Sequence, residues 1–484
     1  MIKKERAIGG VIWSFIDSVA NQGVLFLIGI ILANLLTPYE FGIIGILSII
    51  IAISQSLIDS GFSTALIRKL DCSQNDYSTV FFFNITVAIV IYILLFVFAE
   101  KISLFFEIEE LKLLTRVLGL GVIINSFSLI QKTILTKEIN FKQQAKVSIV
   151  SSIVSGIIAI YLAYSGYGVW SLVALTLLRF LLSSLLFWVW SKWRPSFVFN
   201  VESFTKLFSF GSKLLVSGLI DTIYQNIYLL IIGKYFSAIQ LGYFTRAIQF
   251  QELPSKNLQG IISRVSYPVL ATMQNDVIKL KSSYQQLIKS TMLVTFTLMF
   301  GMVVVAKSMV LVLIGEEWLP VVPYLQLLCL SGMFYPLQSL NLNILNIKGR
   351  SDLYLKLEII KKTMAIPVII MGIIYGIEIM IVGMIISSFI SYYINSYWSG
   401  KMINYSFYEQ VKDLAPIFII AVIINVIVYA ASLYLSLSAF YILIIQIVLG
   451  ALLTVITYEM VEHESYMFIK NEIIKKTLDG KFKR

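Results

Sequence analysis

The sequence predicts an all-α integral membrane protein. Three observations support this: the apolar composition, the recurrence of long apolar segments, and the uneven distribution of basic residues between those segments. Of 484 residues, 58% are hydrophobic and 13% are charged, and the mean hydropathy is +0.86. Soluble domains are about 45–50% apolar. A soluble fold could not hide this much apolar surface, so a lipid bilayer is the solvent that the composition fits.

Apolar segments of about 20 residues, enough to cross a bilayer core, recur from one end of the chain to the other. The first follows residues 1–6 (MIKKER) without a small-residue cleavage site, so we expect a retained helix rather than a cleaved leader. Cutting the chain at glycines, prolines and charge clusters predicts about fourteen transmembrane helices. They are expected near residues 8–36, 40–67, 77–99, 112–136, 144–165, 168–191, 207–233, 241–274, 284–313, 320–347, 352–375, 378–400, 412–434 and 437–460.

Basic residues indicate the orientation of these helices. If both termini face the cytoplasm, most loop lysines and arginines lie inside, including Arg68, Lys69 and the cluster in the tail from Lys470 to Arg484. The opposite loops are short and partly acidic, as at residues 107–110 (EIEE). Membrane topology therefore accounts for the net charge of +11, and no nucleic-acid partner is expected.

The two halves of the chain resemble each other at a spacing of about 200 to 210 positions. Residues 33–42 (ANLLTPYEFG) match 233–242 (GKYFSAIQLG), and 166–170 (GYGVW) stand against 376–380 (GIEIM). Because each unit holds an even number of helices, we expect a parallel repeat about an axis along the membrane normal. The expected parts are a six-helix lobe over 1–200, a second over 201–404, two added helices over 405–462 and a basic cytoplasmic tail over 463–484.

Polar side chains inside the expected helices are the best guide to function, because they are costly in lipid. Milder polar stripes lie on the helices near 8–36, 40–67 and 207–233. They carry Asp17, then Gln55 with Asp59, then Asp221 with Gln225. The strongest stripe lies on the helix near 241–274, at spacings of three or four residues that place it on one face: Arg246, Gln249, Glu252, Lys256, Gln259 and Ser263.

These stripes have two interpretations. If they face one another, they line a hydrated central cavity between the lobes; otherwise they hold helices together inside each bundle. Arg179, in the middle of the helix near 168–191, needs either a carboxylate partner, such as Asp17 or Asp59, or a cavity.

No enzymatic constellation is apparent in the sequence, so an enzyme is not expected. Cys72 and Cys329 lie far apart and predict neither a disulfide nor a metal site. The single histidine, His463, lies in the tail, and no phosphate-binding loop of the ATPase type is present. No cofactor is therefore expected.

Short motifs occur in one order along the chain: 32–42 (LANLLTPYEFG), 59–68 (DSGFSTALIR), 241–246 (LGYFTR), 267–268 (YP), 274–276 (QND), 315–318 (GEEW) and 349–352 (GRSD). By this ordered set of motifs, the chain resembles polysaccharide exporters of the Wzx and teichuronic-acid type. These exporters belong to the multidrug/oligosaccharidyl-lipid/polysaccharide flippase superfamily. The resemblance implies a V-shaped pair of six-helix lobes that alternate access around a cationic cavity. It also implies that the substrate is an undecaprenyl-diphosphate-linked oligosaccharide, flipped across the bacterial inner membrane to make O-antigen, capsule or exopolysaccharide.

Family and physical chemistry together suggest a division of roles. Arg246, Lys256 and Arg179 would attract the diphosphate and acidic sugars. Three carboxylates are candidates for coupling to a proton or a sodium ion: Asp17, Asp59 and Asp221. Side-chain amides would hydrogen-bond the glycan or line its cavity: Gln55, Gln225, Gln249, Gln259, Gln338 and Asn341.

The expected partners are the lipid-linked glycan, membrane lipid and other assembly proteins, such as a polymerase and glycosyltransferases. The alternative function is an ion-coupled small-molecule or multidrug exporter of the same superfamily, similar to MATE proteins, which the three intramembrane carboxylates would suit. The cationic excess on the helix near 241–274 favours an anionic substrate.

Overall fold

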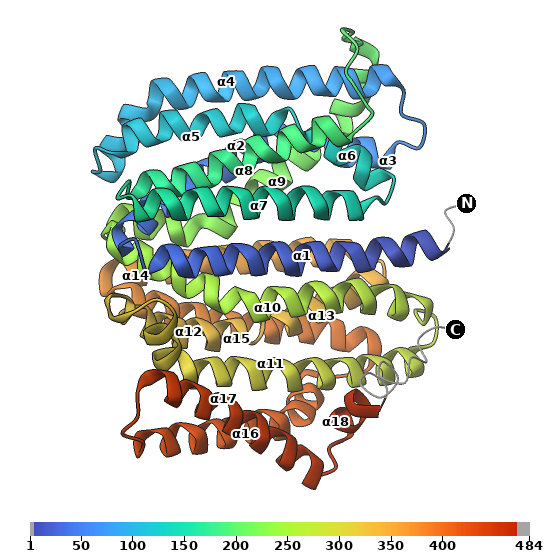
Figure 1. The fold of residues 1–484 in the computed structure, drawn as a ribbon. Coiled ribbons are helices and arrows are strands. Elements are labelled where there is room, and N and C mark those ends of the chain that lie inside the picture. The colour runs from blue at the N-terminus through green and yellow to red at the C-terminus, as the bar shows by residue number, and fades with distance from the viewer. Residues whose placement is uncertain (1–3, 472–484) are drawn as a thin grey trace. The chain divides into compact units, whose positions relative to one another are not determined.

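The computed structural model describes residues 4–471, without the side chains of residues 4–12, 14–16, 256–259, 261–265 and 268. Over this described part, the chain forms helices α1 to α18 and one 3-10 turn, and contains no β-strand (Figure 1). The predicted all-α class is confirmed.

The chain divides into two compact units, Met1–Thr245 and Arg246–Arg484, with the boundary inside α10. The first unit contains α1 (Lys4–Ala33), α2 (Pro38–Asp59), α3 (Phe62–Arg68), α4 (Gln74–Phe106), α5 (Leu111–Ser126), α6 (Leu129–Lys137), α7 (Phe141–Tyr164), α8 (Val169–Trp190), α9 (Val201–Tyr235) and the start of α10 (Ala238–Thr272). The second contains the rest of α10, then α11 (Val277–Leu313), η1 (Glu316–Trp318), α12 (Val321–Gly332), α13 (Tyr335–Ile347), α14 (Ser351–Tyr375), α15 (Ile377–Ile403), α16 (Phe407–Leu433), α17 (Ala439–Met460) and α18 (Glu464–Phe468).

Each of the roughly fourteen expected segments coincides with one helix or with two consecutive helices. Among the described residues, nine helices are long and apolar enough to cross a membrane, and the bent pair α5 and α6, with 41° between them, raises this to ten. Helix α14 does not meet this criterion because charged residues interrupt its apolar run, and α10 combines charged residues with positions whose side chains are not described. In α1 only the shorter stretch Asp17–Ala33 is apolar, and α12 and α13, with 12 and 13 residues, are each too short. The multi-pass character is confirmed, while fourteen crossings remain a prediction.

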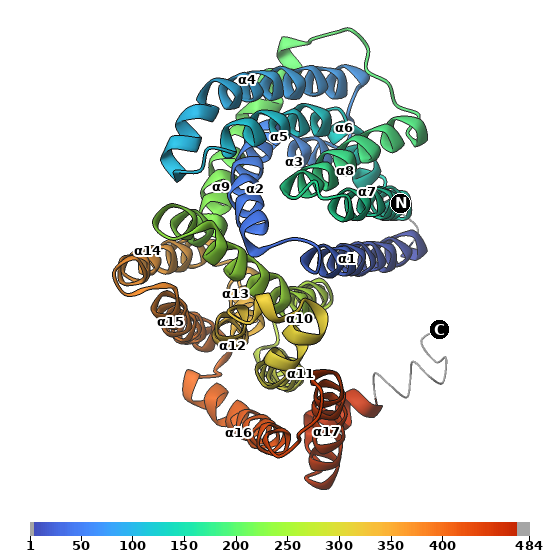
Figure 2. The same ribbon diagram turned by 60° about the vertical axis from the view of Figure 1, so that its left-hand side comes forward.

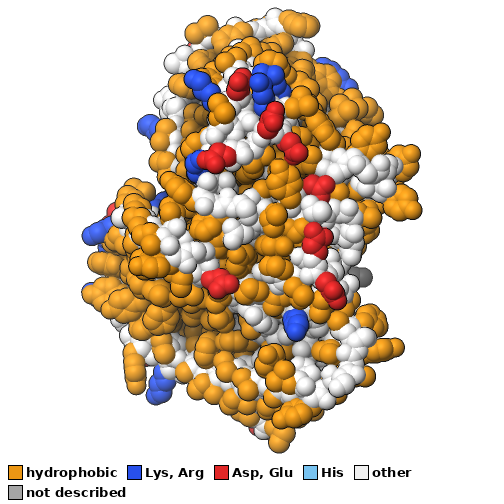
Figure 3. All heavy atoms as spheres, turned by 90° about the vertical axis from the view of Figure 1, so that its left-hand side faces the viewer, with side chains coloured by type: hydrophobic (Ala, Val, Ile, Leu, Met, Phe, Trp, Pro, Cys, Tyr) orange, Lys and Arg blue, Asp and Glu red, His pale blue; other side chains and the backbone are white. Residues whose placement is uncertain are grey.

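The surface of this fold is largely apolar, as expected for a protein surrounded by lipid. Large apolar side chains lie exposed on many helices; for example, Val97 on α4 is 64% exposed and Val448 on α17 is 50% exposed. Hydrophobic side chains also make up most of the face seen in Figure 3. Such a surface would drive aggregation in water, whereas in a bilayer it is solvated by acyl chains.

Within the first unit, α7 packs between α1 and α8, and α2 packs against α5 and α9 (Figure 2). Figure 1 shows the α1–α2, α4–α5 and α7–α8 connections at one end of this unit, and the α3–α4 and α6–α7 connections at the other. Within the second unit, α11 contacts α12, α16 and α17, and α14 pairs with α15. Successive long helices of the first unit therefore run in alternating directions, as a multi-pass chain requires.

The two segments matched in sequence, 33–42 and 233–242, have the same local structure. The Thr37 backbone N–H donates to the Glu40 Oε2 at 2.6 Å, and the Ser237 backbone N–H donates to the Gln240 Oε1 at 3.3 Å. Both are helix N-terminal boxes in which a residue three positions on satisfies the free N–H of the cap. The sequence match therefore marks equivalent helix starts, at α2 and α10.

These two helix starts also contact each other within the first unit. A Cβ on Gly42 would collide with the Ala238 carbonyl oxygen, and a Cβ on Gly242 would collide with the Pro38 carbonyl oxygen. Only glycine permits such a close backbone approach. The contact is reciprocal, as expected for two copies of one hairpin placed face to face.

Candidate functional site

Helix α9 exposes a polar face near the middle of its length. Ser217, Asp221 and Gln225 are spaced four residues apart and are all exposed. On the adjacent face Val216 and Ile220 are 58% and 52% exposed. In this 35-residue helix, Asp221 lies about 30 Å from the start and about 21 Å from the end, at 1.5 Å per residue. Polar side chains near the middle of a candidate span are costly in contact with acyl chains and favourable in contact with water.

On helix α2, Gln55 and Asp59 are half-buried. The Asp59 carboxylate accepts a hydrogen bond from the Ser63 hydroxyl and another, at 3.3 Å, from the Ser63 backbone N–H. The Thr133 hydroxyl of α6 donates to the Ser63 Oγ at 3.1 Å. Asp59 thus holds the turn from α2 into α3 and connects it to α6.

On helix α1, the polar side chains contact α7. The Asp17 carboxylate accepts a hydrogen bond from the Ser148 hydroxyl, and the Asn21 Oδ1 accepts one from the Ser152 hydroxyl at 2.7 Å. Sequence reasoning missed Ser148 and Ser152. The signal was present, because serines recur at spacings of three and four along the apolar helix α7, as in many helix interfaces within membranes.

Arg179 is half-buried on α8, with its guanidinium 5.9 Å from the centroid of the Phe180 ring. In the part of the chain that the structure describes, no carboxylate lies within ion-pair distance of Arg179. The expected pairing with Asp17 or Asp59 is therefore wrong for this structure, since serines hold both carboxylates. The other expectation for Arg179, a cavity, remains a prediction.

Arg246 begins the part of α10 that belongs to the second unit, and it is only 5% exposed. Its Nη1 donates to the Gln249 Oε1 at 2.7 Å, and its guanidinium lies 5.6 Å from the centroid of the buried Trp318 ring. Gln249 itself is exposed. The face predicted from spacing therefore has Gln249 at the surface and Arg246 beneath it, while the side chains of Lys256 and Gln259 lie outside the described residues.

Asn341 lies in a buried polar cluster of the second unit and is 0% exposed. It accepts a hydrogen bond from the Ser399 hydroxyl of α15 at 2.5 Å, and its Nδ2 lies 3.4 Å from the Gln410 Oε1 of α16. Gln338, one turn earlier and half-buried, donates to the Ser388 carbonyl oxygen at 3.0 Å. In this conformation both amides bind neighbouring helices.

His463 follows α17 and lies outside the apolar spans. Burial, and to a smaller extent the positive charge of Lys289, lowers its pKa from the ordinary value. Its Nδ1 accepts a hydrogen bond from the Ser465 backbone N–H at 3.3 Å, at the start of α18. A neutral histidine that caps a short helix has a structural role at this position.

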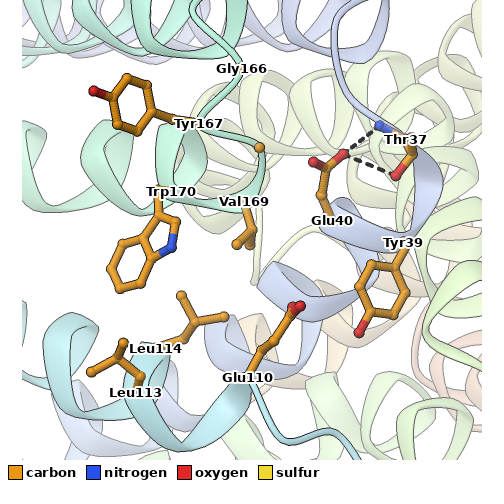
Figure 4. A pocket seen from close by; sticks show the side chains of 11 residues that line it. Thr37, Tyr39, Glu40, Glu110, Leu113, Leu114, Gly166, Tyr167, Val169 and Trp170 are labelled. Atoms are coloured by element: carbon orange, nitrogen blue, oxygen red, sulfur yellow. Dashed lines mark hydrogen bonds between the residues drawn. The ribbon is translucent and has the colours of Figure 1, made fainter.

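A cavity of about 420 Å³ opens in the first unit (Figure 4). Sequence reasoning did not identify it, because its walls come from three turns that are distant in sequence. Within the described part of the chain, no group of three or more metal-binding side chains is present. The cavity is lined by Thr37, Tyr39, Glu40, Glu110, Leu113, Leu114, Gly166, Tyr167, Gly168, Val169 and Trp170.

Comparisons with known proteins identify relatives of this sequence. The model of a family described as "Polysaccharide biosynthesis protein" matches residues 31–323. Teichuronic acid biosynthesis protein TuaB of Bacillus subtilis is 28% identical over 355 residues, covering 72% of this chain and 73% of TuaB. Lipopolysaccharide biosynthesis protein WzxC of Escherichia coli is 25% identical over 378 residues, covering 77% of this chain and 76% of WzxC.

Solved structures share the fold at low sequence identity. The lipid II flippase MurJ in an inward closed conformation gives a TM-score of 0.75 at 17% identity, covering 94% of this chain and 100% of that structure. An inward-facing multidrug resistance MATE family transporter of the MOP superfamily gives a TM-score of 0.62 at 16% identity, covering 81% and 94%. The resemblance noted from the ordered motifs is confirmed, since the family model spans more than half of the sequence. This chain belongs to the polysaccharide biosynthesis protein family and has the fold of the multidrug/oligosaccharidyl-lipid/polysaccharide flippase superfamily.

Proposed function

We propose that this protein is a transporter, not an enzyme, and that it flips oligosaccharides linked to undecaprenyl diphosphate across the bacterial cytoplasmic membrane. The polar face of α9, exposed at mid-depth in a member of a polysaccharide biosynthesis family, is the observation that carries this proposal. A glycan that leaves water must exchange its hydroxyl hydrogen bonds for others. Ser217, Asp221 and Gln225 would supply them, while the lipid tail stays in the bilayer.

The cationic part of the pathway supports a diphosphate-bearing substrate. The Arg246 Nη1 donates to the Oε1 of Gln249, which is exposed, so a phosphate that displaced the Gln249 amide would receive that hydrogen bond. A guanidinium binds phosphate through two parallel hydrogen bonds, which a lysine cannot reproduce. Arg179 is a second cation, and Lys256 lies farther along the backbone of α10.

Transport would proceed by alternating access with both termini in the cytoplasm, so that the α1–α2, α4–α5 and α7–α8 turns face outward. A proton or a sodium ion would drive it, and Asp17 is the first candidate for its site, because its carboxylate lies at the start of the apolar stretch Asp17–Ala33 and has Ser148 as a hydroxyl neighbour. Asp59 and Asp221 are the others. Reporter fusions near Lys4 and Lys470 would both report a cytoplasmic location under this topology.

The test is reconstitution of the purified chain into liposomes that hold an undecaprenyl-diphosphate-linked oligosaccharide. Flipping is measured as the fraction of glycan that an added, membrane-impermeant glycosidase can cut. We expect the wild type to flip, Arg246→Lys to retain part of the rate, and Arg246→Gln to lose most of it. Lys307→Gln, at an exposed lysine of α11, is the matched control and should behave as the wild type.

The melting temperature of each variant is needed alongside, because Arg246 packs on Trp318. A wild-type protein that moved no lipid-linked glycan but extruded small organic cations would contradict the flippase proposal and favour the MATE-like alternative. If a folded Arg246→Gln variant flips at the wild-type rate, the Arg246 guanidinium does not take part in transport.

A further inference from the structure

The cavity of Figure 4 is a second site, since neither the polar face of α9 nor Arg246 lines it. It lies where the first turns of α2, α5 and α8 meet, and it involves the first unit alone. Its volume of about 420 Å³ is within the range of small-molecule sites in proteins, roughly 300–1,000 Å³. One or two sugar rings would occupy that volume.

Two carboxylates face this cavity. Glu40 uses its Oε2 to accept hydrogen bonds from the Thr37 backbone N–H and hydroxyl, at 2.6 and 2.9 Å. Its Oε1 is directed to the α7–α8 turn, where a Cβ on Gly168 would lie 2.7 Å from it. Glycine at that position therefore leaves room beside an accepting oxygen.

The second carboxylate, Glu110, occupies the N-cap position of α5 but makes no side-chain cap hydrogen bond. Figure 4 shows its side chain directed into the space between α2 and α5, near Tyr39. The backbone angles of Glu110 are helical (φ −58°, ψ −29°), unlike the extended angles of the Ser, Thr, Asp and Asn residues that usually cap helices, so no cap hydrogen bond is expected. The exposed Glu110 carboxylate can therefore accept a hydrogen bond from a molecule in the cavity.

Aromatic rings complete the walls. Trp170 stands across the cavity from Tyr39 and Glu40 (Figure 4), and it is 37% exposed. Large flat side chains with one polar edge give apolar contact area to the C–H faces of a sugar ring, while neighbouring carboxylates accept from its hydroxyls. The lining residues include no lysine or arginine, so the site disfavours acidic sugars and favours neutral or amino sugars.

We propose that this cavity binds a neutral or amino sugar of the translocated glycan at the outer face of the first unit. The inference rests on the proposed function, and on the proposed topology that puts these three turns outside. In contrast to the cationic pathway, which would hold the diphosphate, this site holds the sugars as they emerge. One chain would then contact the two chemically different parts of its substrate at two places.

The experiment uses the full-length protein in lipid nanodiscs and measures binding of methyl glycosides by saturation-transfer NMR. We expect methyl glucosaminide and methyl glucoside to bind, and methyl glucuronide to bind about tenfold more weakly, because a carboxylate near Glu40 and Glu110 is repelled. Glu110→Gln should weaken binding of the amino glycoside about tenfold, the loss expected for one hydrogen bond to a charged group. Glu109→Gln, at the adjacent exposed residue, should not.

The contribution of the aromatic side chains is tested with a second pair of variants, both at tryptophans of α8. Trp170→Ala should abolish binding of the neutral glycoside, whereas Trp190→Ala, at the other end of α8 and 40% exposed, should leave it intact. Equal effects of each variant and its control, or no glycoside binding by the wild type, would overturn the inference. Binding of tetramethylammonium without any glycoside would also overturn it, since the cavity would then be a cation site.

The experiments distinguish failure of the cavity proposal from failure of the flippase proposal. Binding needs no translocation, and flipping by the same preparations is measured in liposomes. Wild-type flipping without glycoside binding would reject only this cavity. Glycoside binding lost in Glu110→Gln, together with a wild type that flips nothing, would reject the flippase and leave the cavity as a sugar-binding site without a translocated glycan.

Discussion

The polar face of α9 and the polar cluster around α13 present the same pattern in the sequence but opposite environments in the structure. Ser217, Asp221 and Gln225 repeat every four residues, and Gln338 and Asn341 lie three residues apart, so each set occupies one helix face. The α9 set is exposed. Asn341 is fully buried and hydrogen-bonded to two other helices.

This difference shows that the role of a polar residue depends on what surrounds it in the structure. The residue type alone does not determine that role. A hydrogen bond between helices contributes about 0.6 kcal/mol on average in membrane proteins, yet deleting one partner leaves the other without its bond in a dry interior. An exposed amide at mid-depth adds little to the stability of its unit, but it requires water. The buried cluster should therefore control stability, and the α9 face should control transport.

The largest stability change is expected for Asn341→Leu. It removes the acceptor of the Ser399 hydroxyl and a partner of Gln410, and both lie buried. The expected cost is about 2–3 kcal/mol in the free energy of unfolding, measured by thermal unfolding in detergent, with a parallel fall in membrane abundance. Flipping per folded molecule should stay near the wild-type rate. If Asn341→Leu has normal stability but no longer transports, Asn341 acts in the transport pathway and not in stability.

The double substitution Ser217→Leu with Gln225→Leu should have the opposite profile. The melting temperature should hardly change, because both side chains are exposed. Flipping should fall about tenfold, the equivalent of about 1.4 kcal/mol in a barrier. Ile223→Leu, on the adjacent apolar face of α9, is the control. If the double variant flips normally, the polar face of α9 does not contact the substrate.

On helix α1, Asp17 combines the two roles, because its carboxylate is hydrogen-bonded to Ser148 and it is also a candidate for ion coupling. Ser148→Ala should lower stability by about 1 kcal/mol and leave the ion dependence of flipping unchanged. Asp17→Asn should abolish the response of flipping to an imposed proton or sodium gradient. An Asp17→Asn variant that still responds to both gradients would assign Asp17 to the α1–α7 interface.

The smallest effect is expected for Gln338→Leu. Its amide makes one hydrogen bond, to the Ser388 carbonyl oxygen, and the side chain is half-buried. We expect a loss of about 0.5 kcal/mol in unfolding free energy and little change in flipping. A loss as large as that of Asn341→Leu would mean that half-buried and buried amides on α13 are equivalent, so that burial would not set the stability contribution of an amide.

Much of the fold follows from local signals in the sequence. Apolar length predicted the helices, and the turns were marked by glycines such as Gly166 and Gly376, both of which have positive φ. The match of 33–42 with 233–242 predicted equivalent hairpins, because a cap such as Thr37 with Glu40 is a short-range feature. The bend between α5 and α6 was not predicted, since the expected helix near 112–136 contains no proline or other clear break.

The candidate site was less predictable, for a geometric reason. Spacing shows which side chains share a helix face, but it does not show what that face contacts. The contacts between Asp17 and Ser148, and between Asn341 and Ser399, join residues far apart in the chain. The cavity near Glu110 has the same origin, because three separate turns build it.

The most direct test of a hydrated pathway along α9 is the water accessibility of single cysteines, introduced after Cys72 and Cys329 have been replaced by alanine. Membranes that contain Ser217→Cys, Gln225→Cys, Ile223→Cys or Asn341→Cys are treated with a water-soluble maleimide, and the rate of labelling is measured. Cysteines at 217 and 225 should label rapidly if the proposed pathway is hydrated. Those at 223 and 341 should label slowly, because the proposal places position 223 in lipid and because position 341 is buried. If position 225 labels no faster than 223 and 341, the polar face of α9 does not line a hydrated pathway, and the proposed route for the glycan is contradicted.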